Sequence, residues 1–163
     1  MPRERTLEEL QHAASAGDME AQYELAQRYE NGVGIVQNVR LAAAQYRKAA
    51  EAGHIEAQLT MAKLCLIGKG TQPDPQEAAR WYESAAGQGS TTAQFNLGEM
   101  YACGRGVPQD IGLAAEWYCR AAAKGHDEAE ARLADLHDAG TQLPIESSAA
   151  AAKYSRRRKS PSN

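Results

Sequence analysis

The sequence predicts an all-α fold, a solenoid of stacked helix pairs, because a single residue pattern returns every thirty-six positions. Alanine, glycine and tyrosine positions all follow this period. The three series are Ala21, Ala57, Ala93 and Ala129; Gly32, Gly68, Gly104 and Gly140; and Tyr46, Tyr82, Tyr118 and Tyr154. A fixed period of this length is typical of repeat proteins, which mostly provide binding surfaces.

The chain opens with a segment that matches only the second half of a repeat. In residues 7–17, LEELQHAASAG, Leu10 takes the position of the repeated tyrosine and Gly17 that of the terminal glycine. We therefore expect residues 1–17 to form an N-terminal capping helix that covers the first full repeat.

The first half of each repeat is predicted to be a helix that ends at glycine. Ala21, Leu25 and Tyr29 share one side of the helix at a spacing of four residues. Gly32 and Gly34 follow, and glycine ends helices readily because it tolerates positive φ.

The second half of each repeat is predicted to begin at a capping residue and to run for about 13 residues, or roughly 20 Å. The expected capping residues are Asn38, Asp74 and Asp110. In the middle repeat, Pro75 stands at the first helical position, and Glu77 is placed to return the capping bond, which predicts a capping box.

The last repeat departs from the pattern, since Gln142 replaces the second loop glycine and Arg157 and Arg158 replace the paired alanines. Terminal repeats need a polar outer face, so this departure is expected. We predict one domain overall, and its segments are a cap (1–17), repeats at 18–53, 54–89 and 90–125, a degenerate C-terminal repeat or cap (126–158), and a basic disordered tail (159–163).

Charge is unevenly distributed along the chain. The formal net charge is −3, but five cations and one acid follow residue 145, which leaves −7 on the body. An acidic body argues against nucleic acid as the main ligand, because phosphate binding requires a basic face.

Cysteine usage and hydropathy predict a cytoplasmic protein without a membrane span. The three cysteines, Cys65, Cys103 and Cys119, are odd in number and lack CxxC spacing, which indicates a reducing compartment. The N-terminus lacks the apolar region of a secretory signal, and no apolar stretch is long enough to span a bilayer.

The repeats resemble a known family. The third, TTAQFNLGEMYACGRGVPQDIGLAAEWYCRAAAKG, and the second, through AQLTMAKLCLIGKG and DPQEAARWYESAAGQG, carry the consensus of the Sel-one-like repeat (SLR) family, a branch of the tetratricopeptide-like (TPR-like) superfamily. The first repeat departs from it with Ala26 at the glycine position, Arg28 at an apolar position and Gln45 in place of tryptophan. The resemblance covers residues 7–154.

The resemblance implies a right-handed α-solenoid whose concave groove is lined by the outward side of each first helix, and a role as adaptor or assembly scaffold. The partner-binding residues predicted on this side are Glu20, Tyr23, Gln27, Glu30, Asn31, Glu56, Leu59, Lys63, Leu66, Ile67, Thr92, Phe95, Glu99 and Cys103.

Two interpretations are open for the apolar residues on this side. Tyr23, Leu59 and Phe95 form a row that either docks a partner or packs between neighbouring first helices. Leu66 and Ile67 are expected in the groove, because the first repeat has Glu30 and Asn31 at these positions.

The chain shows no motif for catalysis, metal or cofactor binding. His54 and His126 share one repeat position and are expected to cap the next helix or to face solvent, since ligand spacings such as HxxxH are absent. The run from Gly68 to Thr71 lacks the spacing of a phosphate-binding loop, and no GxSxG elbow is present. Cys103, close to Arg105, is the one candidate for a reactive thiol.

We therefore predict a non-enzymatic adaptor that binds a protein or peptide partner, with no cofactor and with small-molecule ligands not expected. One alternative is a weak hydrolase of the cysteine-rich Sel-one-like type, which is associated with β-lactam binding, although the paired cysteines of that branch are missing here. The other alternative is a regulatory subunit that its basic tail directs to an anionic surface.

Overall fold

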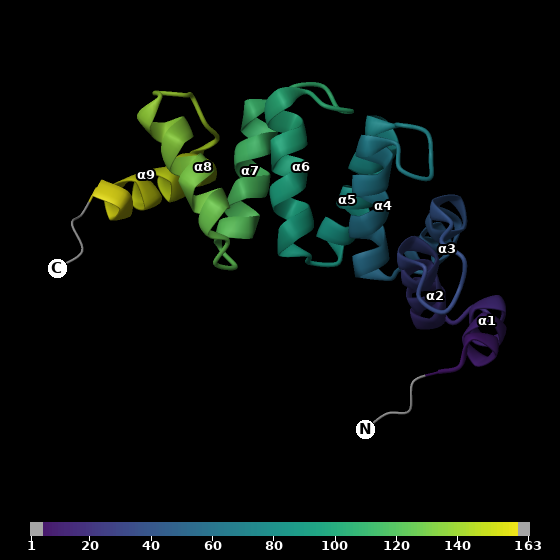
Figure 1. The fold of residues 1–163 in the computed structure, drawn as a ribbon. Coiled ribbons are helices and arrows are strands. Elements are labelled where there is room, and N and C mark those ends of the chain that lie inside the picture. Colours follow the sequence, from purple (N-terminus) through teal and green to yellow (C-terminus); the bar gives the residue numbers. More distant parts are fainter. Residues whose placement is uncertain (1–4, 160–163) are drawn as a thin grey trace. The chain divides into compact units, whose positions relative to one another are not determined.

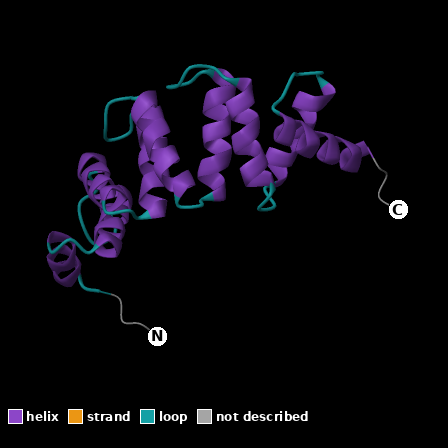
Figure 2. Cartoon of the chain, turned by 180° about the vertical axis from the view of Figure 1, so that it is seen from behind, coloured by secondary structure: helices purple, strands orange, loops and turns teal. Residues whose placement is uncertain are grey.

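The computed structural model describes residues 5–159, and every regular element within them is a helix (Figures 1 and 2). The helices are α1 (Leu7–Ser15), α2 (Met19–Asn31), α3 (Val39–Glu51), α4 (Ile55–Ile67), α5 (Pro75–Gly87), α6 (Thr91–Cys103), α7 (Ile111–Ala122), α8 (Asp127–Asp138) and α9 (Ile145–Lys159). A single helix is therefore followed by helices in pairs, in the order that the sequence predicts.

The helices pack as successive neighbours, which is the arrangement of a helix-pair solenoid. In unit 1, α3 lies against α2 and contacts α4 of the next repeat, and in unit 2, α7 lies against α6, as Figure 1 shows, and contacts α8. The predicted fold class is thus confirmed. The chain divides into two compact units, Met1–Ser84 (unit 1) and Ala85–Asn163 (unit 2), and this boundary lies inside α5.

The helix ends follow the predicted chemistry. Asn38, Asp74 and Asp110 accept hydrogen bonds from backbone N–H groups in the first turns of α3, α5 and α7. Gly32, which ends α2, adopts a left-handed conformation with φ of 72°, and its equivalents at the ends of α4 and α6 do the same. The caps satisfy helix-end groups that have no partner within the helix.

The predicted capping box at Glu77 is wrong. The backbone N–H of Asp74, which Glu77 would have to bond, donates to the carbonyl oxygen of Cys65 at 2.8 Å. This bond ties the loop back to the preceding first helix, and the other two loops form it as well. A capping box is formed in α1 instead, between Thr6 and Glu9.

The Glu77 carboxylate lies in a polar cluster that joins α3, α4 and α5. It pairs with the guanidinium of Arg47, and it accepts hydrogen bonds from Nε1 of Trp81 at 3.2 Å and from Sγ of Cys65 at 3.5 Å. The bond from Arg47 holds the pKa of Glu77 below its ordinary value. The cluster thus stabilises the ionised carboxylate where two successive repeats meet.

Buried glutamines connect each of the first three repeats to the helix before it. Nε2 of Gln22, Gln58 and Gln94 donates to a carbonyl oxygen near the C-terminal end of the preceding second helix, at 3.1, 3.0 and 3.4 Å. These side chains are at most 7% exposed. Each of these carbonyl oxygens also accepts the N–H of the glycine that follows the helix, so the amide makes its second hydrogen bond and the buried side-chain N–H gains a partner.

The core consists mainly of alanines and of the repeated tyrosines. Tyr82 and Tyr118 are each 2% exposed, and the alanines of the series from Ala21 to Ala129 are fully buried. Alanine lets helices approach closely and allows each tyrosine ring to fill the space between the two helices of its repeat. Gly98 permits a close approach of this kind, because a Cβ atom there would lie 2.6 Å from the ring of Tyr118.

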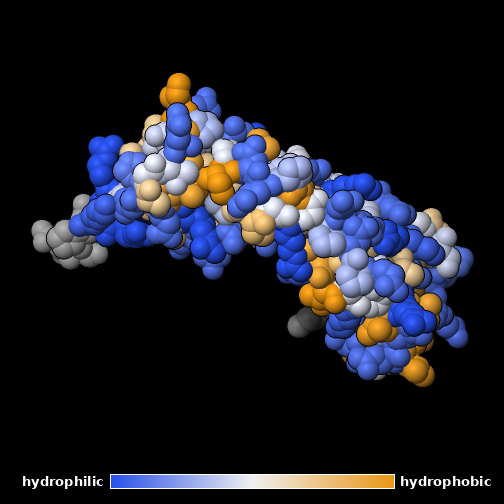
Figure 3. Space-filling model, turned by 90° about the horizontal axis from the view of Figure 1, so that it is seen from above, coloured by the Kyte–Doolittle hydropathy of each residue, from blue (hydrophilic) through white to orange (hydrophobic). Residues whose placement is uncertain are grey.

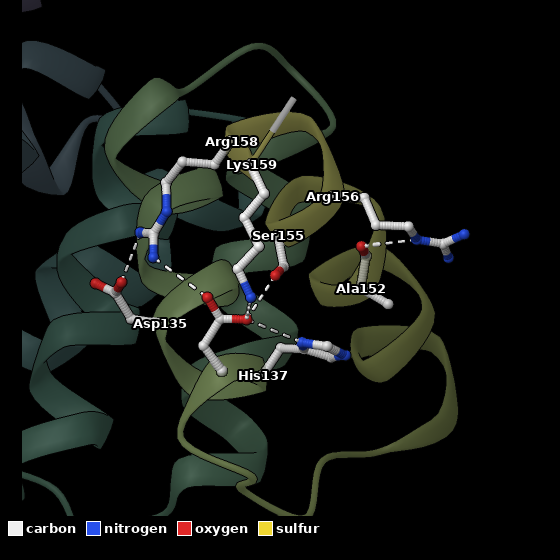
Figure 4. A network of polar contacts seen from close by, with 8 residues as sticks. Asp135, His137, Ala152, Ser155, Arg156, Arg158 and Lys159 are labelled. Atoms are coloured by element: carbon white, nitrogen blue, oxygen red, sulfur yellow. Dashed lines mark hydrogen bonds and ion pairs between the residues drawn. The ribbon is translucent and has the colours of Figure 1, made fainter. Parts of the chain in front are cut away.

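The C-terminal basic residues are helical and paired, in contrast to the expected disorder from residue 159. Lys159 is the last residue of α9, and its ammonium lies 3.0 Å from Asp138. Figure 4 shows Ser155, Arg158 and Lys159 of α9 directed toward carboxylates of α8. Arg157 pairs with Glu130 at 3.3 Å. The rest of the predicted tail, residues 160–163, lies outside the described residues.

We expect Gly70→Ala to destabilise the protein far more than Gly34→Ala, although both glycines occupy the same repeat position. Both have positive φ, which costs about 1–2 kcal/mol for alanine. A Cβ atom at Gly70 would also lie 2.2 Å from the carbonyl oxygen of Val39. A Cβ atom at Gly34 would have no such neighbouring atom within 4 Å. The expected losses are about 3–5 and about 1–2 kcal/mol. Denaturant unfolding measures both, and equal losses would contradict the close contact.

Glu77→Gln should lower the free energy of unfolding at neutral pH. The free energy of unfolding of this variant should also depend less on pH under acidic conditions. Because the folded-state pKa of Glu77 lies below the unfolded value, the stabilisation is fully present above about pH 4.5 and is lost as the pH falls through the folded pKa. We expect a loss of about 1 kcal/mol at pH 7, since Arg47 is 37% exposed and water screens the pair.

Urea unfolding between pH 7 and about pH 3 measures the difference in the free energy of unfolding between the wild-type chain and Glu77→Gln. The gap between the wild-type chain and Glu77→Gln should narrow as the pH falls. Glu83→Gln, an exposed change on the same helix, is the control and should leave stability nearly unchanged. A gap that stays constant over this range would show that the Glu77 charge is not responsible.

Candidate functional site

The outward side of the first helices carries the residues predicted to bind a partner. We call this side the first-helix face; it is formed by α2 and α4 in unit 1 and by α6 and α8 in unit 2. Glu20, Gln27, Asn31, Glu56, Lys63 and Thr92 are all exposed on it. These positions are accessible, and their role in partner binding stays a prediction.

In unit 1, the ring of Tyr23 is part of an aromatic cluster. It stacks on the ring of His54, with centroids 4.4 Å apart, and lies tilted against Tyr46 at 5.5 Å. Nδ1 of His54 accepts a hydrogen bond from the N–H of Ala57 at 3.1 Å, so His54 caps α4. Capping was one of the two roles predicted for this residue. Nε2 of His54 lies 3.2 Å from the Glu20 carboxylate. Tyr23 therefore helps to hold the next repeat in place.

Unit 2 repeats this arrangement with a different ring. Phe95 stacks on His126 with centroids 4.5 Å apart and lies tilted against Tyr118 at 5.8 Å. Nδ1 of His126 accepts the N–H of Ala129, and His126 thereby caps α8. Packing between repeats thus accounts for much of the surface of Tyr23 and Phe95, both of which are partly buried.

The apolar residues of α4 differ in exposure. Leu59 is only 6% exposed, so the member of the apolar row in the middle repeat packs inside the protein. Leu66 is partly buried, and Ile67 at the end of the helix is 66% exposed. Of the apolar residues predicted on α4, Ile67 offers the most surface to a partner.

Two of the predicted acidic residues already have cationic partners in the chain. Glu30 accepts hydrogen bonds from Lys69 at 2.7 Å and from the hydroxyl of Tyr46 at 2.8 Å, and the bond from Lys69 lowers the pKa of Glu30. Glu99 accepts the hydroxyl of Tyr118 at 2.5 Å and two bonds from Arg132, at 2.8 and 3.0 Å. These two carboxylates therefore serve first to satisfy the buried tyrosines.

Unit 2 has two adjoining hollows on its first-helix face. The larger, of about 430 Å³, contains Cys103, Leu136 and Ala139, with Ala102 and Tyr118 also in its wall. The smaller, of about 340 Å³, lies against Phe95, Glu128 and Ala131. Glu99, Arg132 and Asp135 line both hollows. Of the predicted residues, Phe95, Glu99 and Cys103 are thus brought together here.

Several residues at these sites escaped the sequence interpretation. Arg132, Asp135 and Leu136 come from the degenerate last repeat, where the repeat pattern is weakest, and Lys69 lies in a loop. The buried glutamines could have been found, because Gln22, Gln58 and Gln94 keep the period of the repeat. The ion pairs could not, because their members do not recur.

The three thiols differ in environment. Burial, together with the Glu77 carboxylate, raises the pKa of Cys65 to about 12, and burial raises that of Cys119. Both are therefore protonated at neutral pH, and thiolate is the reactive form. Cys103 is exposed in the wall of the larger hollow. No disulfide joins the three, so the alternative of a cysteine-rich hydrolase is not favoured.

Neither a metal site nor a membrane-spanning helix is found in residues 5–159. The side chains there form no group of three or more histidine, cysteine, aspartate or glutamate residues suited to a metal ion. None of the helices in that range combines the length and apolar character required to cross a bilayer. On the face seen in Figure 3, apolar residues form small patches separated by hydrophilic ones.

Stacked helix pairs whose first helices present side chains on one face define the class of helical repeat proteins that act in protein–protein interaction. The Sel1 repeat family profile matches residues 20–54, 55–90, 91–126 and 127–157. The chain therefore belongs to the Sel1 repeat family, as its resemblance to Sel-one-like repeats predicted. Proteins of this family generally act as non-catalytic scaffolds that mediate protein–protein interaction.

Solved structures agree with this assignment. A Sel1 repeat protein from Oxalobacter formigenes is 43% identical with a TM-score of 0.73, and the match covers 79% of this chain and 97% of that one. The protein c5321, a protective antigen of uropathogenic Escherichia coli strains with an SLR fold, is 31% identical with a TM-score of 0.81. That match covers 93% of this chain and only 32% of c5321.

A more distantly similar structure shares only its fold with this chain. Cysteine rich protein B of Helicobacter pylori is 23% identical with a TM-score of 0.57, over 76% of this chain and 95% of that one. A search of the curated proteins finds no match to the chain.

Replacing His54 should separate its capping role from its stacking role. Ser90 occupies the same repeat position and caps α6 through its hydroxyl, so His54→Ser keeps a cap for α4 and removes the ring. We expect His54→Ser to cost about 0.5–1.5 kcal/mol from the lost stacking on Tyr23. His54→Ala should cost about 1 kcal/mol more, because the cap is lost as well.

Thermal and denaturant unfolding of the two variants measures these losses. Tyr23→Leu, which resembles the leucine of the middle repeat, is the matched control, and His54→Ser should cost little in that background. If the serine and alanine variants are equally stable, the histidine does not act as a cap.

Proposed function

We propose that the chain is a non-enzymatic adaptor that binds a protein or peptide partner on its first-helix face. The observation that carries the proposal is the pair of adjoining hollows in unit 2, where Phe95, Glu99 and Cys103 of α6 meet residues of α8. A surface hollow that is partly apolar and holds a few fixed polar groups is suited to a side chain of a partner.

Unit 1 adds a second contact region to the proposal. Ile67 is 66% exposed at the end of α4, next to the partly buried Leu66. Lys69, two residues further along the chain, forms an ion pair with Glu30. An exposed aliphatic side chain next to an ion pair is typical of an interface centre with a polar rim. The predicted groove residues that are exposed, such as Gln27 and Glu56, would belong to this rim.

The proposal also includes a cytoplasmic location, for which the three unpaired cysteines are the support. The basic end of α9 contributes less to the proposed function than the sequence suggested. Arg157, Arg158 and Lys159 are paired with carboxylates of α8, which reduces their availability to an anionic surface.

Affinity capture with three forms of the full chain tests the adaptor function. The double variant Leu66→Glu, Ile67→Glu should lose specific partners by about tenfold or more, because two charges would enter the apolar contact. Ile145→Glu is the matched control; Ile145 is 89% exposed on α9, away from the first-helix face, and its replacement should leave capture unchanged.

Far-ultraviolet circular dichroism should show equal helicity for the three forms. If the wild-type chain captures partners and the double variant captures them equally well, binding does not use the first-helix face of unit 1. If no form retains any protein above an unrelated helical control, the adaptor function itself is wrong.

A further inference from the structure

We propose that the larger hollow of unit 2 binds a peptide segment through one apolar side chain that is flanked by a lysine or arginine. This inference rests on the adaptor function proposed above and specifies the chemistry of its ligand. It concerns residues of α6, α7 and α8 within unit 2 only.

Small residues open the hollow. Ala102 and Cys103 at the end of α6 occupy the positions that Leu66 and Ile67 hold in the preceding repeat. Ala139, just after α8, is likewise small. The resulting volume of about 430 Å³ lies within the usual range of ligand pockets, roughly 300–1,000 Å³. The two repeats therefore differ at these positions, with large apolar side chains in one and small side chains beside a hollow in the next.

The polar groups in the wall of the hollow are satisfied by one another. The hydroxyl of Tyr118 donates to Glu99, and Arg132 donates two hydrogen bonds to the same carboxylate. A ligand therefore need not supply a partner for any of them, and a polar ligand group would compete with bonds that are already made. Leu136, with the alanines and the tyrosine ring, leaves apolar surface for the ligand to cover. An aliphatic or aromatic side chain fits this environment.

The adjoining smaller hollow determines the charge of the ligand. It has three carboxylates in its wall, those of Glu99, Glu128 and Asp135, and one guanidinium, that of Arg132. The guanidinium is engaged by Glu99, and Asp135 pairs with Arg158 at 2.7 Å. Glu128 is exposed and adds an uncompensated negative charge. A cation of the ligand is therefore favoured beside the apolar side chain, and an acidic group is disfavoured.

Selection of random peptides displayed on phage against the immobilised full chain provides the probes. The enriched peptides should carry leucine, methionine or phenylalanine close to lysine or arginine. The strongest binder, synthesised with a fluorescent label, is then measured by fluorescence anisotropy against the wild-type chain and its variants.

The double variant Ala102→Leu, Cys103→Ile fills the hollow with the residues of the preceding repeat, which favours correct folding. It should weaken peptide binding by about tenfold or more. Glu128→Lys should weaken it by about threefold to fivefold, and a peptide with glutamate in place of its cation should bind this variant better than it binds the wild-type chain. Glu83→Lys, an exposed charge change on α5, should leave the affinity unchanged.

Unfolding curves and helicity should match the wild type for every variant compared. Enrichment of acidic peptides, failure to enrich any peptide, or unchanged affinity after the hollow is filled would overturn the inference. These results would leave the adaptor function standing if the capture experiment still shows partners that depend on Leu66 and Ile67, so the two proposals can fail separately.

Discussion

The structure depends on the hydrogen bond from a buried glutamine to the end of the preceding helix. Each such bond joins the first helix of one repeat to the second helix of the repeat before it, from Gln22 to Ala14, Gln58 to Ala50 and Gln94 to Ala86. The carbonyl oxygen also accepts the N–H of the following glycine, so the bond chiefly gives the buried side-chain amide a partner, and an unpaired buried donor costs about 1–3 kcal/mol. The bond therefore allows alanine-lined helices to stack closely, and the stacking in turn creates the first-helix face.

The last repeat shows the result of losing this bond. Glu130 stands at the glutamine position, and a carboxylate cannot donate to the preceding helix end. It pairs instead with Arg157, and further ion pairs hold α9 to α8. The hydroxyl of Ser155 and the ammonium of Lys159 lower the pKa of Asp138. Ala129, Leu133 and Ala151 are fully buried in the same region, so apolar packing and ion pairs together hold α9 to α8. Exposed ion pairs contribute little individually and are screened by salt, so these pairs add only modestly to the apolar packing of the last repeat.

The first-helix face has both a structural and a potential binding role. Tyr23 and Phe95 stack on the histidines that cap the following helices, and Glu30 and Glu99 satisfy buried tyrosine hydroxyls. What remains for a partner is the surface that packing leaves over, which is Ile67 in unit 1 and the hollows in unit 2. In the proposed function, differences between repeats at equivalent positions set where the partner binds, while the shared positions build the solenoid.

The sequence by itself determined the repeat period, most of the helix-end residues and the fold class, because each depends on local chemistry that recurs at a fixed spacing. The αL glycines at the helix ends and the capping residues Asn38, Asp74 and Asp110 are of this kind. Only the tertiary structure decided that Glu77 pairs with Arg47 and forms no capping box, that Leu59 is buried, and that Arg132 reaches Glu99. These outcomes depend on which side chains of different helices come within contact distance, and residue spacing along one chain does not contain that information.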